Sequence, residues 1–165
     1  ALVPLVSQNL SQGVKEIRLR SKRLYPYIFG TSALLLLGSK YFFPLVFNES
    51  FAASAPVFNI YILLIISRMI YPQTIMLGQK RTKALLYIAI LELMINIFVS
   101  LALAFKFGLL GIAAGTVIAF SSEKIMQIIY LKLKRGISIH HYVDVKPYAL
   151  YSAGLVIVWL FTILF

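Results

Sequence analysis

The stretch that decides the fold lies between residues 84 and 131 and reads ALLYIAILELMINIFVSLALAFKFGLLGIAAGTVIAFSSEKIMQIIYL. It contains two long apolar runs, residues 84–105 and 108–131, with Lys106 between them. Each run is close to the ~20 residues that a helix needs to cross the hydrocarbon core of a bilayer. Because the apolar residues are continuous rather than alternating, these runs predict membrane-spanning helices and not strands.

Three further runs extend this pattern along the chain. They cover residues 25–43, 55–78 and 147–165, so the expected fold is an all-α, polytopic transmembrane bundle of about five spans. Pro26 is expected at the start of the first of these runs, where its missing N–H costs nothing. Pro44 is expected to close the same run.

The composition requires a solvent other than water. Hydrophobic residues make up 61% of the 165 residues, and the mean hydropathy is +0.89. A soluble core in a chain of this length could not bury so many apolar side chains. The absence of cysteine excludes disulfides, thiolate metal sites and a cysteine nucleophile. Residues 1–10 look like the tail of an earlier span and the last run is apolar to its end, so we expect a fragment of a longer protein.

The positive charge is distributed unevenly among the predicted loops. The formal charge is +11, from 16 Lys and Arg against 5 Asp and Glu. Alternate loops, at residues 15–23, 79–83 and 132–146, hold twelve of the basic residues, whereas the loops on the other side hold only Lys106. By the positive-inside rule the basic loops are expected in the cytoplasm. No nucleic-acid partner is expected, because no basic face is interleaved with stacking aromatic residues.

Ionisable residues within the predicted spans are the candidate functional residues. Each costs about 2.5–3.5 kcal/mol at the centre of a membrane helix, so it usually faces a partner or a wet cavity. Arg68 and Glu92 lie at matching depth on consecutive spans, and an ion pair between them is expected, either as packing or beside a cavity. Glu123 and Lys124 are further cavity candidates. Lys124, like Lys40 at the outer end, is nevertheless expected to extend its ammonium to the membrane surface.

Pro72 lies four residues after Arg68 within the second predicted span. A proline inside a helix leaves the carbonyl four residues earlier without its donor. We therefore expect the helix to kink at Arg68 and the freed carbonyl to need water or another partner. Irregular backbone beside an intramembrane charge is typical of a cavity wall, although an incidental kink is common in membrane helices.

Small and polar residues predict close packing between the third and fourth spans. Gly108, Gly111 and Gly115 give the fourth span a small face, and the Gly-x-x-x-Gly spacing lets a neighbouring backbone approach closely. Asn96 in the third span is expected to hydrogen-bond across to another helix.

No arrangement typical of an enzyme is present in the sequence. His140 and His141 are adjacent, with only Asp144 nearby, and this spacing suits no standard metal site. Both histidines are expected to be solvated, and no metal or other cofactor is expected. There is no nucleophile elbow, phosphate loop or paired-carboxylate arrangement, so catalysis is not expected.

Several segments resemble a known transporter family. They are VPLVSQ at residues 3–8, FNESF at 47–51, LGQ at 77–79 and FKFGLLGIAAGT at 105–116. In order and spacing, residues 1–146 resemble the polysaccharide transporter branch of the multidrug/oligosaccharidyl-lipid/polysaccharide exporter superfamily. That branch contains the O-antigen and lipid-linked oligosaccharide flippases.

The resemblance implies that residues 1–165 form most of the C-terminal lobe of a two-lobe transporter that works by alternating access. It implies that the substrate is a polyprenyl-diphosphate-linked glycan, moved to the outer leaflet of the plasma (inner) membrane. The expected partners are the lipid bilayer, this glycan lipid and the N-terminal lobe of the same protein. An anionic diphosphate would need a cationic, wet cavity, to which Arg68 and Lys124 would contribute while Glu92 restrains Arg68.

Three other interpretations stay open. A drug–cation antiporter of the same superfamily would favour acidic over basic cavity residues. A membrane-embedded glycan-processing enzyme would need a substantial outer loop with Arg and His, and the outer loops here are short. A structural membrane subunit would need Arg68 and Glu92 packed fully against each other, with no cavity.

Overall fold

A computed structural model of the chain describes residues 2–164, apart from the side chains of residues 52 and 53. Within these residues the chain is all-helical and contains no strand, which confirms the predicted fold class at this level. The elements are α1 (Leu2–Gln8), α2 (Leu10–Val46), η1 (Glu49–Ser54), α3 (Ala55–Ile62), α4 (Leu64–Arg68), α5 (Pro72–Gly78), α6 (Thr82–Arg135), α7 (Ile139–Tyr142) and α8 (Val145–Leu164). Among the described residues, α2, α6 and α8 are three helices long and apolar enough to cross a membrane, or up to four if the bent segment from α3 to α5 is counted.

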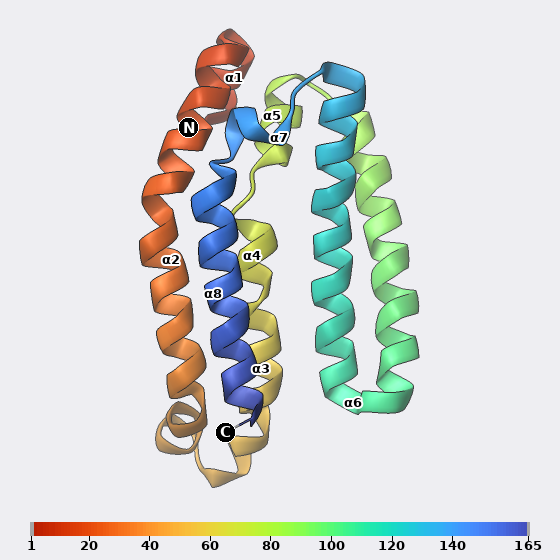
Figure 1. The fold of residues 1–165 in the computed structure, drawn as a ribbon. Helices are drawn as coiled ribbons and strands as arrows, with labels where there is room; N and C mark the ends of the chain where they lie inside the picture. Colours follow the sequence, from red (N-terminus) through yellow and green to blue (C-terminus); the bar gives the residue numbers. More distant parts are fainter. Residues whose placement is uncertain (1, 165) are drawn as a thin grey trace.

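Helix α6 consists of two antiparallel arms rather than one straight rod. As a rod its 54 residues would extend about 80 Å at ~1.5 Å per residue, far more than the ~30 Å of a hydrocarbon core. The chain reverses at Gly108, whose φ of 57° and ψ of −133° are accessible because glycine has no Cβ. Figure 1 shows the two arms side by side, and Ser100 Oγ on the first arm lies 3.5 Å from the Ile112 carbonyl oxygen on the second. The first arm (residues 82–107) and the second arm (residues 109–135) correspond to the predicted third and fourth spans.

Helix α2 starts earlier than the sequence predicts. It begins at Leu10, where the Asn9 side chain caps it by accepting a backbone hydrogen bond. The basic segment 15–23, expected as a loop, is therefore the first part of a 37-residue helix. Pro26 lies inside this helix instead of at its start, so that expectation is wrong. Pro44 does lie close to the helix end.

The segment predicted as the second span is broken. Helix α4 ends at Arg68, and α5 begins at Pro72 after a short non-helical link. The axes before and after the link differ by 47°. Proline suits the first turn of a helix, because an N–H there has no intrahelical acceptor. The interruption lies where Pro72 predicts one, but the proline begins a new helix rather than bending a continuous one.

The basic segments gather at one end of the bundle. Figure 1 shows α1, α5, α7 and the two ends of α6 at the top, with the reversal of α6 and η1 at the bottom. Arg135 Nε donates to Gln79 Oε1 at 2.8 Å, which joins the end of α6 to the turn before it. Arg18 and Lys22 of α2 lie 3.5 and 2.8 Å from the carboxylate of Asp144, just before α8. The three segments predicted to share one side of the membrane therefore lie together.

The larger of the two clusters of buried apolar residues lies at this basic end. Val6 of α1 is 2% exposed and lies against Gly13 of α2 and Gly78 of α5. A Cβ on either glycine would come within 3.0 Å of Val6, so only glycine allows this approach. A second cluster joins α2, α3, α4 and α8 around Tyr25 and Phe29. The apolar side chains of α6 stay largely exposed, as expected for a surface that faces lipid or another membrane segment.

Candidate functional site

Arg68 is the last residue of α4 and is exposed at the break in the second predicted span. Its guanidinium carbon Cζ lies 4.4 Å from the ring centroid of Phe120, on the second arm of α6. This cation–π contact attracts the guanidinium without neutralising its charge. Among the residues that the structure describes, Arg68 forms no ion pair. A full positive charge is therefore presented on the surface of the bundle.

The predicted ion pair between Arg68 and Glu92 is wrong. Glu92 is half-buried on the first arm of α6 and, by helical spacing, shares a face with Asn96 and Ser100. Ser100 contacts the second arm, so this face is turned toward that arm. In Figure 1 the second arm lies between the first arm and α4. The pairing was expected because consecutive spans are usually neighbours, but the later arm is inserted between these two.

The broken backbone next to Arg68 is stabilised by a side chain from α8. The hydroxyl of Tyr148 donates to the Ile66 carbonyl oxygen at 2.8 Å. In a continuous helix that carbonyl would accept from the N–H of Ile70, but Ile70 lies in the non-helical link. The sequence predicted that a carbonyl here would need a new partner, although it indicated Arg68 rather than Ile66. No local pattern identified Tyr148, because the contact joins residues 82 positions apart.

Lys124 and Glu123 form a second polar group, on the second arm of α6. Lys124 is 6% exposed, and its Nζ lies 3.4 Å from Glu123 Oε2. Gln127 Nε2 donates to Glu123 Oε1 at 2.7 Å, while Gln127 Oε1 is buried without a partner. The prediction that Lys124 extends to the cytoplasmic surface is therefore wrong. Lys124 lies one turn from Phe120, on the face that packs inward, where its charge is balanced by Glu123.

Glu123 also lines a cavity of about 310 Å³ between α5 and the two arms of α6. The rest of the lining is mostly apolar and comprises Gln73, Leu77, Thr82, Leu85, Leu86 and Ala89. The Glu123 carboxylate thus contacts the cavity while it is held by Lys124 and Gln127.

The three glycines of the predicted packing face have two different roles. A Cβ at Gly111 would come within 3.0 Å of the Leu103 carbonyl, and one at Gly115 would come within 3.0 Å of Ser100. These two glycines therefore let the arms of α6 approach closely, as the Gly-x-x-x-Gly spacing predicts. A Cβ at Gly108 would meet nothing within 4 Å, so its role is the reversal with positive φ and not packing.

The other polar residues singled out in the sequence make local contacts. Asn96 Oδ1 accepts from Ser100 Oγ at 2.9 Å on the same arm, and the expected hydrogen bond from Asn96 to another helix is not found among the residues that the structure describes. His140 and His141, in α7, are both exposed, and His141 Nδ1 lies 3.1 Å from the Ser138 carbonyl oxygen. In the described part of the chain, no three or more His, Cys, Asp or Glu residues group so as to hold a metal ion.

Comparisons of the chain with protein families, with characterised proteins and with solved structures find no match. The resemblance to polysaccharide transporters therefore rests on the sequence motifs alone. Function is therefore inferred from the fold and from the charges that the fold places within the apolar helices.

Proposed function

We propose that the chain is the C-terminal lobe of a flippase that moves a polyprenyl-diphosphate-linked glycan across the plasma (inner) membrane by alternating access. The observation that carries the proposal is the exposed Arg68, a cation at a helix break that has no carboxylate partner among the described residues. In this proposal five segments cross the bilayer: α2, the broken segment from α3 to α5, the two arms of α6, and α8. The basic end faces the cytoplasm.

The depth of Arg68 supports a role at a water-filled surface. Arg68 lies about 20 Å from Ala55 along α3 and α4, at ~1.5 Å per residue, within a segment that crosses a ~30 Å core. Exposing a guanidinium to lipid at the centre of the core costs ~2.5–3.5 kcal/mol or more. Broken backbone at this depth is tolerated where it lines a cavity or is covered by protein. In the proposed two-lobe transporter, the exposed side of Arg68 therefore faces the water-filled cavity between this lobe and the N-terminal lobe.

The chemistry of Arg68 suits an anionic diphosphate. A guanidinium presents paired N–H donors that match phosphate oxygens and keeps its charge at any physiological pH. Phe120 orients the guanidinium from one side and offers no acceptor that would compete with a phosphate. The polar edge of Arg68 is thus free to bind a diphosphate headgroup as it passes.

The same geometry disfavours the alternative functions. A structural subunit would need Arg68 neutralised against Glu92, and that pair is absent from the described structure. A drug–cation antiporter would need an accessible carboxylate without a cation beside it. Glu123 is already paired with Lys124, and Glu92, which forms no ion pair within the described residues, is turned toward the second arm of α6. A glycan-processing enzyme would need a larger outer loop than the short link through η1.

The proposal is tested by replacing Arg68 in cells whose surface glycan depends on the full-length protein. Arg68→Ala should abolish glycan export while the amount of protein in the membrane stays unchanged. Arg68→Lys should retain part of the activity, because the charge remains and the bidentate geometry is lost. Export is measured as surface glycan, and membrane insertion by immunoblotting of the membrane fraction.

Lys83→Ala is the matched control, because Lys83 is an exposed cation at the basic end that lies outside the broken segment. It should leave export close to the wild-type level. Normal export by Arg68→Ala would contradict the proposed role. Resistance to cationic drugs that depends on Glu92 or Glu123 would instead support the antiporter.

A further inference from the structure

A cavity of about 340 Å³ opens at the basic end, between the first turns of α2 and the connection from α6 to α7. One part of its lining is apolar and comes from Leu10, Val14 and Ile137. The other part is polar and comes from Ser11, Lys15 and His141. A lining of this kind suits an amphiphile with a charged head, because both halves of such a ligand find a matching surface.

The separation between the cavity and the reversal at Gly108 matches the thickness of a bilayer. Gly136, which also lines it, directly follows the second arm of α6. That arm runs from the reversal at Gly108, so the cavity is about 40 Å from the reversal at ~1.5 Å per residue. A bilayer measures ~40–45 Å including its headgroups. With the reversal at one surface, the cavity reaches the headgroup region of the opposite leaflet.

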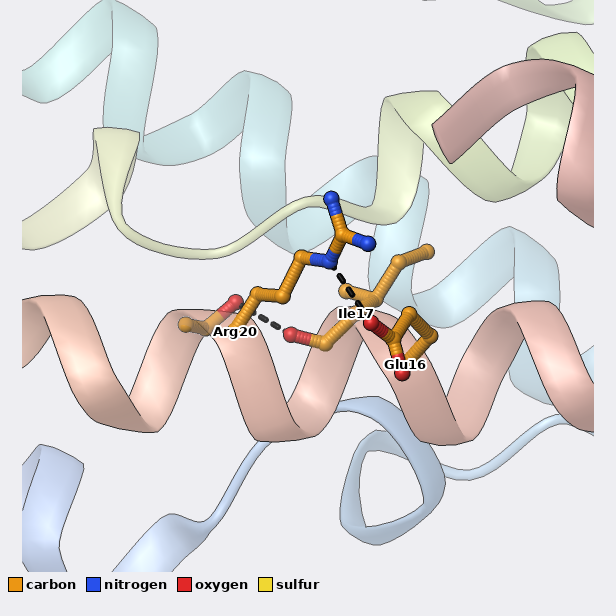
Figure 2. A network of polar contacts seen from close by, with 4 residues as sticks. Glu16, Ile17 and Arg20 are labelled. Carbon is orange, nitrogen blue, oxygen red and sulfur yellow. Dashed lines mark hydrogen bonds and ion pairs between the residues drawn. The ribbon is translucent and has the colours of Figure 1, made fainter. Parts of the chain in front are cut away.

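Three of the five basic residues of the segment on α2 form ion pairs with carboxylates. Arg20 Nε lies 2.7 Å from Glu16 Oε1 on the same face of the helix (Figure 2). Arg18 and Lys22 share the Asp144 carboxylate. Lys15 forms no ion pair within the described residues, and it is the basic residue of this segment that lines the cavity. Its ammonium therefore lacks an anion at the place where the cavity opens.

His141 adds a second donor on the opposite wall. Its Nδ1 lies 3.1 Å from the Ser138 carbonyl oxygen, and a carbonyl can only accept, so Nδ1 carries the proton of this contact. Nε2 is left for another partner and donates to an anion when the ring carries both protons. Lys15 and His141 thus line one cavity from α2 and α7, and Ser11 lies one helical turn before Lys15 on α2.

We propose that this cavity binds the headgroup of an anionic phospholipid of the inner leaflet. Lys15, His141 and Ser11 hold the phosphate, while Leu10, Val14 and Ile137 contact the glycerol and the first carbons of the acyl chains. Basic recesses between membrane helices on the cytoplasmic side are typical binding places for anionic headgroups. The lipid would bridge α2 to the α6–α7 connection. The site is distinct from Arg68, and it does not depend on the proposed substrate.

The experiment measures retained lipid on the purified chain by native mass spectrometry, in detergent with equal amounts of phosphatidylglycerol and phosphatidylcholine. The wild-type chain should retain phosphatidylglycerol in preference to phosphatidylcholine. Lys15→Gln combined with His141→Gln should weaken phosphatidylglycerol retention about tenfold, as expected for lost hydrogen bonds between charged groups. Lys15→Arg should keep the lipid, because it keeps the charge and the donors.

Lys134→Gln is the matched control, because it removes an exposed cation at the same end without touching the cavity. It should retain phosphatidylglycerol like the wild type. Equal retention by the Lys15 and His141 double variant would overturn the proposal. Displacement of the lipid by millimolar inorganic phosphate would also overturn it and assign the cavity to a soluble anion. Circular dichroism of each variant checks that its helices are intact.

Discussion

Lys124 and Arg68, two basic residues inside the apolar segments, occupy opposite environments. Lys124 is 6% exposed, lies 3.4 Å from the Glu123 carboxylate and is surrounded by its own bundle. Arg68 is exposed, has an aromatic ring instead of a carboxylate and lies where the helix is broken. In the sequence both residues are cations within hydrophobic runs, and only their surroundings in the folded structure distinguish them.

This difference separates a structural charge from a functional one. In a buried ion pair each charge compensates the other, so removing one member leaves the remaining charge without compensation. An exposed cation held only by a ring contributes little to folding and keeps its capacity for a ligand. Lys124 is therefore expected to matter for stability, and Arg68 for transport.

The largest expected effect compares the two positions directly. Lys124→Ala should lower the free energy of unfolding by about 3 kcal/mol, because the Glu123 carboxylate, only 14% exposed, is left without a cation beside it. Arg68→Ala should lower it by less than about 1 kcal/mol, since only an exposed cation–π contact is lost. Thermal unfolding of both variants in the same detergent measures the difference.

A double variant sharpens the same comparison. Lys124→Met together with Glu123→Gln removes both charges and should recover most of the stability that Lys124→Ala loses. If Arg68→Ala proved as destabilising as Lys124→Ala, the division into a structural and a functional cation would be wrong.

A smaller effect is expected at the break itself. Tyr148→Phe removes the hydroxyl that satisfies the Ile66 carbonyl and should cost about 1–2 kcal/mol, because the carbonyl is left without a donor. Tyr41→Phe is the control, since Tyr41 is 75% exposed. Chemical denaturation of both variants measures the cost. An unchanged unfolding midpoint for Tyr148→Phe would mean that water replaces the hydroxyl, as expected if the break lines a wet cavity.

The smallest effect concerns Asp144, which joins α2 to α8 at the basic end. The hydrogen bond from Lys22, with the charge of Arg18, holds the pKa of the Asp144 carboxyl below its ordinary value of 3.8. The folded state therefore binds this proton less readily than the unfolded state. This contact therefore stabilises the folded state above about pH 4, and the stabilisation is lost as the pH falls through the lowered pKa of Asp144 in the folded state.

Unfolding midpoints of the wild type and of Asp144→Asn, measured between neutral and acidic pH, test this linkage. The wild type should be the more stable of the two at neutral pH, and the difference should shrink as the pH falls below about 4. A difference that stays constant across the whole range would show that the carboxylate charge has no part in the contact.

Much of the fold was predictable because apolar length and loop charge are local properties. The two arms of α6 were separated correctly by composition, and Pro72 indicated the interruption before α5. The prediction of an Arg68–Glu92 ion pair failed, because ion pairing between helices depends on which helices are neighbours. Sequence order suggested the first arm of α6 as the neighbour of α4, whereas Phe120 on the second arm provides the contact.

The sequence by itself determined that the chain is helical, apolar enough for a membrane and basic at one end, since these follow from hydrophobic length and charge placement. It also predicted a break around Lys106 and the close approach at Gly111 and Gly115, whereas Gly108 was expected in the packing face and the structure shows that it forms the reversal. The tertiary structure decided which charges are neutralised. Burial and partners depend on packing between distant segments, so Lys124 became an internal ion pair while Arg68 stayed exposed.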